Sequence, residues 1–198
     1  KWGEVPIRFA RPIHWILALF GEEIVPFELG NIRSGNVTYG HRFMSSGSIQ
    51  VKDFNTYLKK MEDGYVIVDP AKRRRRIEEE MIREGASVEG KVLWDEELLN
   101  EVNFLVEYPV ALCGRFDPNF LTLPREVVIH SMKEHQRYFP LEDDRGFLLP
   151  HFVCISNTAP KDRTVVVRGN ERVLKARLSD ANFFFQDDLK VPLEKRLE

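Results

Sequence analysis

The chain contains only two cysteines among 198 residues, and none of its cysteines or histidines has the spacing of a zinc site. Cys113 and Cys154 lie in the apolar contexts VALCGRF and HFVCISN. Such surroundings favour reduced, buried thiols and an intracellular protein over a disulfide. No apolar run approaches the roughly 20 residues of a membrane helix, and no signal peptide is recognised. We therefore expect a cytoplasmic protein that does not bind a membrane.

The sequence also lacks the common motifs of catalysis. It contains no H-E-x-x-H, G-x-S-x-G, G-x-x-x-x-G-K-S/T or G-x-G-x-x-G pattern. His130 and His135 are five residues apart, which predicts that they lie on different faces of a helix. The acid pairs Asp143-Asp144 and Asp187-Asp188 fall in turn or helix-end contexts and are typical of solvated surface. We predict no catalytic residue and no metal site in this chain.

Charges of the two signs nearly balance, with 29 lysines and arginines against 31 aspartates and glutamates. The overall charge therefore neither indicates nor excludes a nucleic-acid partner, and local clusters must decide. The chain opens on Lys1 without a methionine, and Pro192 stands at a plausible first helical position just before the last residues. We expect a fragment of a longer polypeptide.

Hydrophobic periodicity and turn residues predict strands and helices without strict alternation. This mixture favours an α+β fold with a mostly antiparallel, mixed sheet and packed helices. Asp53, Asp95 and Asp69-Pro70 are strong helix starts, with aspartate as the cap and proline in the first turn. The expected strands span residues 13–20, 24–29, 38–43, 65–68, 110–116, 138–141 and 149–156, and a helix is the alternative for the first of them. The expected helices span residues 53–61, 69–84, 95 to before 109, and 124 to about 136. A last helix is expected to begin at 164 or at 170 and to end at 188. We expect an α+β core over residues 1–160 and a long basic helix over 161–198 that leads to the next domain.

Two stretches concentrate cations that suit phosphate. The first is Lys72-Arg73-Arg74-Arg75-Arg76, since guanidinium groups bind phosphate bidentately. Its alternative is a solvated helix with Arg75–Glu79 and Arg76–Glu80 ion pairs. The second stretch spans residues 161–178, in which Gly169 would let backbone N–H groups approach an anion, or Asn170 would simply cap a helix.

Aromatic side chains mark two further stretches. Ser131–Phe139, written SMKEHQRYF, suits stacking and hydrogen bonding to nucleic acid, or a packed corner between a helix and a strand with Phe139 in the core. At least one aromatic side chain of Phe183–Phe185 should face a partner or missing sequence. We expect the cations to gather on one face of the molecule. The candidate nucleic-acid contacts are Arg73, Arg74, Arg76, His135, Gln136, Arg137, Tyr138, Arg168, Arg172 and Arg177.

Six segments together resemble, in the same order, the beta subunit of bacterial glycyl-tRNA synthetase, the heterotetrameric type. They are FARPIHW (9–15), TYGHRF (38–43), LVEYPVAL (105–112), LPREV (123–127), MKEHQRYF (132–139) and RGNERVLKARLSDA (168–181), the last followed by FFF (183–185). The segments cover nearly the whole chain. The resemblance implies that this chain comes from the N-terminal half of a much longer subunit.

The resemblance implies that the whole complex is a glycine–tRNA ligase, with ATP and Mg²⁺ bound by the alpha subunit and no cofactor in this chain. The implied partners are the alpha subunit, tRNA(Gly) and the remainder of the beta subunit. The implied fold is similar to the editing-type domain of the phenylalanyl-tRNA synthetase beta subunit. Because glycine has the smallest side chain, a tight pocket excludes its competitors and editing is not needed. We expect a tRNA-contacting, bridging role; the alternatives are docking without RNA contact and hydrolytic editing.

Overall fold

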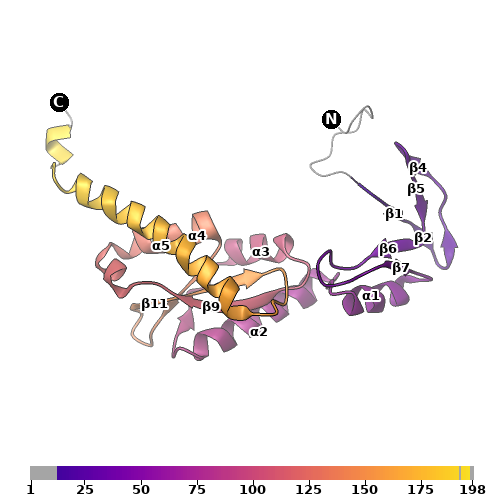
Figure 1. The fold of residues 1–198 in the computed structure, drawn as a ribbon, viewed down its shortest axis with the longest axis horizontal. Helices are drawn as coiled ribbons and strands as arrows, with labels where there is room; N and C mark the ends of the chain where they lie inside the picture. The colour runs from indigo at the N-terminus through magenta and orange to yellow at the C-terminus, as the bar shows by residue number, and fades with distance from the viewer. Residues whose placement is uncertain (1–12, 192, 197–198) are drawn as a thin grey trace. The chain divides into compact units, whose positions relative to one another are not determined.

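The computed structural model describes residues 13–191 and 193–196. These residues belong to two compact units, and the chain passes from the first to the second between Asp69 and Pro70 (Figure 1). The first unit holds short strands and one helix, and the second holds four α-helices and the largest sheet. We expected a core domain over residues 1–160 and a separate helix over 161–198. Whether these two parts fold separately stays a prediction.

The first unit is built from small sheets. Strand β5 pairs in parallel with β1 and antiparallel with β4, while β2–β3 and β6–β7 are antiparallel pairs. The strands expected over 13–20 and 24–29 are present as short pieces, and the glycine-rich segment 31–47 holds two strands where one was expected. The elements are β1 (Ile16–Leu17), β2 (Leu19–Phe20), β3 (Glu23–Ile24), β4 (Glu28–Leu29), β5 (Ile32–Gly35), β6 (Val37–Tyr39), β7 (Ser48–Gln50) and α1 (Phe54–Asp63).

Helix α1 begins and ends through local hydrogen bonds. Asp53 accepts a hydrogen bond from the Thr56 N–H at 2.8 Å, so the predicted cap is confirmed. At the other end Tyr65 has a φ of 60°, and the Val66 N–H donates to the Met61 carbonyl at 2.8 Å. The strand expected over 65–68 is therefore wrong, because the backbone at its start closes the helix instead of pairing in a sheet.

The second unit contains a four-stranded antiparallel sheet in the order β8–β10–β11–β9. The predicted hairpin is confirmed as β10 and β11, and the last helix follows the earlier of its two expected starts. The α+β class with a mostly antiparallel, mixed sheet is therefore confirmed. The elements are α2 (Pro70–Ala86), β8 (Lys91–Val92), α3 (Glu96–Leu105), β9 (Val110–Arg115), η1 (Pro118–Thr122), α4 (Arg125–Gln136), β10 (Phe139–Glu142), β11 (Leu148–Ser156), α5 (Arg163–Asp188) and η2 (Leu193–Arg196).

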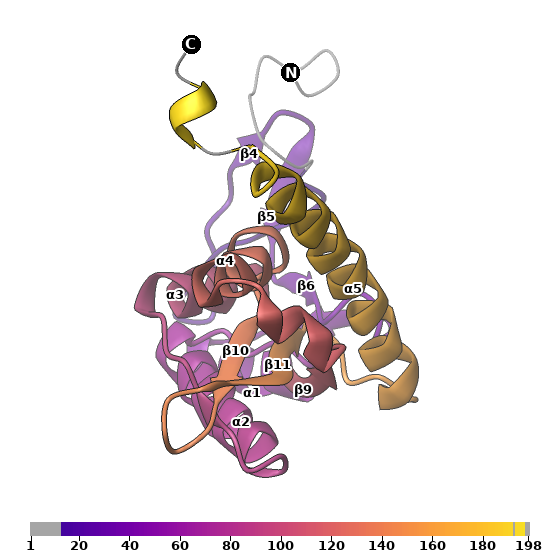
Figure 2. The ribbon, with the colours of Figure 1, turned by 90° about the vertical axis from the view of Figure 1, so that its left-hand side faces the viewer.

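Helices cover both faces of this sheet (Figures 1 and 2). Helices α2 and α3 pack on one face, and α4 and α5 pack on the other. Successive residues of β9 alternate between the two cores, with Ala111 in the first and Leu112 in the second. Leu174 and Leu178 attach α5, since both side chains are fully buried in the second core. The two cores therefore place α2 and α5 on opposite sides of the sheet.

Candidate nucleic-acid interface

A groove between α5 and the ends of β9 and β11 brings four lysine and arginine residues together. Its volume is about 640 Å³. Apolar groups line it together with cations and two carboxylates. The lining residues are Arg115, Phe116, Asp117, Pro118, Pro150, His151, Arg168, Glu171, Arg172 and Lys175. We refer to these ten residues as the cationic groove.

Helical periodicity brings three of the cations together. Arg168, Arg172 and Lys175 are four and three residues apart, so they lie on one face of α5. Leu174 and Leu178 hold the helix against the sheet by burying a neighbouring stripe. Arg115 joins them from the last position of β9. A strand end and a helix face thus converge on the same space.

The cations of the groove form no close ion pair within the described part of the chain. In the part of the chain that the structure describes, the side chains of Arg115, Arg168, Arg172 and Lys175 form no hydrogen bond or ion pair and are exposed. The two carboxylates already accept hydrogen bonds from backbone N–H groups. Asp117 caps η1 at 2.9 Å, and Glu171 accepts from the Arg115 N–H at 3.0 Å. Such a groove attracts phosphate groups.

The first two candidate arginines of α2 form hydrogen bonds or ion pairs with other residues of the chain. Arg73 is buried, and its Nε donates to the Asn103 carbonyl at 2.7 Å. Arg74 forms ion pairs with Glu78 at 2.8 Å and Glu96 at 2.6 Å. These contacts join α2 to α3. These partners reduce the charge and the number of N–H donors that either arginine can offer to a phosphate.

Arg76 is engaged in the same way. Its Nε donates to the Pro109 carbonyl at 3.1 Å and pairs with Glu80 at 3.2 Å, and its guanidinium lies 4.1 Å from the centroid of the Tyr108 ring. The Arg76–Glu80 pair expected for a solvated helix is therefore confirmed. The expectation that these cations and those of α5 share one face is wrong, because α2 and α5 cover opposite faces of the sheet. Arg75, which was not among the candidates, is the exposed arginine of the run.

The stretch at the end of α4 is a packed corner. Arg137 has a φ of 56°, and its Nε pairs with Glu101 at 2.9 Å. Tyr138 is buried, with its ring stacked on Phe152 at a centroid distance of 4.6 Å. Its hydroxyl donates to Oδ1 of Asn170 at 2.8 Å. The packed-corner interpretation is confirmed for these two residues.

The other candidates lie away from the cationic groove. His135 packs against His130 with ring centroids 5.8 Å apart, and both line a second groove of about 570 Å³ with Arg177 and Asp180. Five residues correspond to about 140° around a helix axis, so the two positions differ around α4 as predicted. Their side chains nevertheless meet. Gln136 lines a separate cavity of about 370 Å³.

Helix α5 begins before the residues expected to start it. Asp162 is the cap and accepts from the Thr164 N–H at 2.8 Å. Gly169 and Asn170 therefore lie inside the helix, and neither the anion-binding turn nor the Asn170 cap is present. Asn170 instead donates from Nδ2 to the Val166 carbonyl at 3.1 Å. The arginines on either side can therefore offer only their side chains to an anion.

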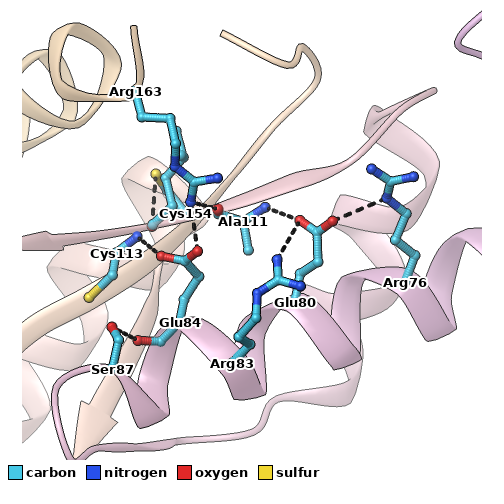
Figure 3. A network of polar contacts seen from close by, with 10 residues as sticks. Arg76, Glu80, Arg83, Glu84, Ser87, Ala111, Cys113, Cys154 and Arg163 are labelled. Carbon is cyan, nitrogen blue, oxygen red and sulfur yellow. Dashed lines mark hydrogen bonds and ion pairs between the residues drawn. The ribbon is translucent and has the colours of Figure 1, made fainter.

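The outer edge of β9, whose last residue lines the groove, is closed by side chains (Figure 3). Carboxylates of α2 and α5 accept hydrogen bonds from its outward N–H groups, and one arginine donates to an outward carbonyl. These bonds are Ala111 N to Glu80 at 2.8 Å, Cys113 N to Glu84 at 3.2 Å, Arg115 N to Glu171 at 3.0 Å, and Arg163 to the Ala111 carbonyl at 2.9 Å. Arg163 also pairs with Glu84 at 2.6 Å. The closure leaves no row of unpaired backbone groups along the described part of β9.

The two cysteines are free thiols, as expected, and they lie on neighbouring strands. Cys154 is buried as predicted, whereas Cys113 is only half-buried. Burial raises the pKa of Cys154 to about 12 and that of Cys113 to about 11, so neither is a thiolate nucleophile at neutral pH. Among residues 13–191 and 193–196 there is no cluster of three or more histidine, cysteine or acidic side chains suited to a metal. Within the same residues, every helix is too short or too polar to cross a membrane.

The fold and the groove together define an α+β module with exposed cations along one face of α5. The family model of the glycyl-tRNA synthetase beta subunit matches residues 1–198. The chain belongs to this family, which confirms the resemblance seen in the six segments. Residues 9–12 of the first segment lie outside the described part of the chain.

Curated relatives agree over the whole chain. It is 56% identical over 198 residues to the glycine–tRNA ligase beta subunit of Geotalea uraniireducens, 54% to that of Geobacter sulfurreducens and 51% to that of Syntrophus aciditrophicus. In each case all of this chain is covered, together with 29% of the relative. The chain thus spans less than a third of the length of these relatives.

Proposed function

We propose that the chain is a tRNA-contacting part of the beta subunit of a glycine–tRNA ligase, a cytoplasmic aminoacyl-tRNA synthetase that attaches glycine to tRNA(Gly). In this proposal ATP and Mg²⁺ bind to the alpha subunit, and the present chain holds no catalytic residue. Its role is positioning: the cationic groove neutralises backbone phosphates and helps to direct the acceptor arm towards the partner subunit. We also propose that the fold of this chain is similar to the editing-type domain of the phenylalanyl-tRNA synthetase beta subunit.

The observation that carries the proposal is the contrast between two sets of cations. Arg73, Arg74 and Arg76 have partners inside the fold, whereas Arg168 and Arg172 have exposed side chains without a hydrogen bond or ion pair in the described chain. Solvated arginines held on a rigid helix can bind phosphate without first losing a partner. The groove is therefore the surface best suited to RNA.

The test removes the two arginines without changing the fold. We predict that Arg168→Ala/Arg172→Ala weakens binding of tRNA(Gly) and lowers the slope of log K against log salt by roughly 1.5, as expected for two lost phosphate contacts. Binding is measured by fluorescence anisotropy over a series of salt concentrations. Circular dichroism confirms that the helix content is unchanged.

A matched control removes two exposed cations elsewhere. Lys59 on α1 and Arg145 in the turn between β10 and β11 are exposed and lie outside the groove. Lys59→Ala/Arg145→Ala should leave affinity and slope close to those of the parent chain. If both double variants behave alike, or if the groove variant binds as the parent does, the cationic groove is not the RNA site.

Docking without RNA contact is the second candidate, and one observation favours it. Phe183 and Phe184 are 66% and 64% exposed near the end of α5, as expected for an aromatic run that cannot face one core. An apolar surface of this kind is typical of a protein contact. A chain that associates with the alpha subunit but does not bind tRNA(Gly) at any salt concentration would favour docking over RNA contact.

A further inference from the structure

The cationic groove is not only a charged surface, because apolar groups line it between the cations. Phe116 directly after β9, Pro118 of η1 and Pro150 of β11 contribute apolar groups, and His151 of β11 contributes a flat imidazole ring. Pro118 is exposed, and Pro150 and His151 are half-buried, so a ligand can reach them. A site for phosphates alone would not need this lining.

The size of the groove limits what can enter it. Its volume of about 640 Å³ lies within the range of small-molecule pockets, about 300–1,000 Å³. Bases in a duplex are stacked inside the helix, so a duplex presents only its sugars and phosphates to such a concave surface. An unpaired nucleotide presents a flat base as well, and bases of single strands stack on flat side chains, including histidine.

The cations of the groove suit the phosphate of a nucleotide, and its flat side chains suit the base. Arg168, Arg172 and Lys175 come from α5, and His151 comes from β11, so the charged and flat walls belong to different elements. His151 is paired with Arg115 in the β9–β11 register, which places an imidazole and a guanidinium on neighbouring strands. A phosphate held by the α5 cations would leave its base facing the strand ends.

We propose that the cationic groove binds unpaired nucleotides of RNA, with phosphates on Arg168, Arg172 and Lys175 and a base against His151 and the adjacent prolines. This inference rests on the proposed function and names the part of the RNA that the groove accepts. The groove should bind a single-stranded end or loop more tightly than a paired stem.

The first test compares two forms of one RNA. A short fluorescent single-stranded RNA and the same strand annealed to its complement are titrated with the chain at equal salt. The single strand should bind about fivefold or more tightly, the effect expected for one stacked base. Adenosine monophosphate should displace the single strand at lower concentration than inorganic phosphate does. Equal binding of both RNA forms, or equal competition by the two small anions, would overturn the inference while leaving the proposed function intact.

The second test separates stacking from charge. His151→Ala should weaken single-strand binding about fivefold or more at an unchanged salt slope, and His151→Phe should restore it because a flat ring is kept. Arg168→Ala/Arg172→Ala should instead lower the slope for both RNA forms. A His151→Ala variant that binds the single strand as the parent does would overturn the inference. Absence of RNA binding by the parent chain would overturn the proposed function as well.

Discussion

Tyr138 joins the corner after α4 to α5 through a single buried hydroxyl. Because this hydroxyl donates to Asn170 at 2.8 Å, Tyr138→Phe should lower the free energy of unfolding by about 1 kcal/mol. Burial raises the pKa of Tyr138 well above its ordinary value, so the donor is retained over the usual pH range. Urea denaturation followed by circular dichroism measures the change.

A second variant separates the hydroxyl from the ring. Tyr138→Leu also removes the stacking on Phe152, which should cost about 0.5–1.5 kcal/mol more. If Tyr138→Phe were as stable as the parent chain, water would satisfy Asn170 equally well and the hydroxyl would not stabilise this corner.

Asp95 links the start of α3 to α4 and makes stability depend on pH. Its carboxylate accepts from the Leu98 N–H at 3.0 Å and from Lys133 Nζ at 2.9 Å, and these two bonds, in that order, lower its pKa below the ordinary value of 3.8. A carboxyl with a lower pKa in the folded state stabilises the fold above its unfolded-state pKa. That stabilisation is lost as the pH falls from about 4 through the folded-state pKa.

Two substitutions of Asp95 test this. Asp95→Ala should cost about 1 kcal/mol at pH 7, the usual loss for a helix cap. Asp95→Asn keeps a capping oxygen but cannot ionise, so its stability should change less than that of the parent chain between pH 5 and about 3. Identical pH profiles of unfolding for Asp95→Asn and the parent would contradict the assignment.

Single residues show which parts of the site the sequence could predict. The caps Asp53 and Asp95 were predicted because their partners lie three residues away. The partner of Arg73 is a carbonyl 30 residues away on α3, which no local pattern indicates. Arg115 and Lys175 were missed for the same reason, since only the packing of α5 beside β9 brings them together.

At the scale of elements, the edge of β9 depends on Glu84. Its carboxylate accepts from the Cys113 N–H and pairs with Arg163, so Glu84→Ala leaves both donors without this partner. We expect the free energy of unfolding to fall by about 1–3 kcal/mol. An open edge also invites pairing with a second chain, so self-association should rise with concentration. Denaturation and sedimentation velocity measure the two effects.

Glu79→Ala is the matched control, since Glu79 is an exposed glutamate of the same helix. It should leave stability and self-association near those of the parent chain. Equal behaviour of the two variants would show that Glu84 does not protect the edge.

Elements with strong local signals were predicted well. Helices α1 and α3 and the β10–β11 hairpin follow from caps, periodicity and turn residues. The strand expected over 65–68 is absent because the N–H groups of Tyr65 and Val66 donate to carbonyls of α1. A run of hydrophobic residues does not show whether the backbone pairs in a sheet or closes a helix. The two possible starts of α5 were resolved only by Asp162, a cap that lies six residues before Arg168.

At the scale of the whole molecule, the sheet separates the two groups of arginines that the sequence placed together. Helix α2 faces one core and α5 the other, and no residue of α2 lines the groove. Sequence periodicity shows which face of a helix is apolar, but not which face of a sheet the helix covers. This arrangement follows from strand order and the helix connections, which had not been predicted.

The last prediction concerns where the chain divides. Among the described residues, both cores of the second unit draw only on those between Ile77 and Phe185, so residues 70–198 should fold alone and unfold cooperatively. Residues 1–160 lack α5 and would expose the surface that Leu174 and Leu178 cover, each of which contributes about 1.5–3 kcal/mol. Domains of ordinary stability have only about 5–15 kcal/mol in total. We therefore expect residues 1–160 to bind a hydrophobic dye and to lack a cooperative transition in calorimetry, whereas a sharp transition would favour the boundary at residue 160.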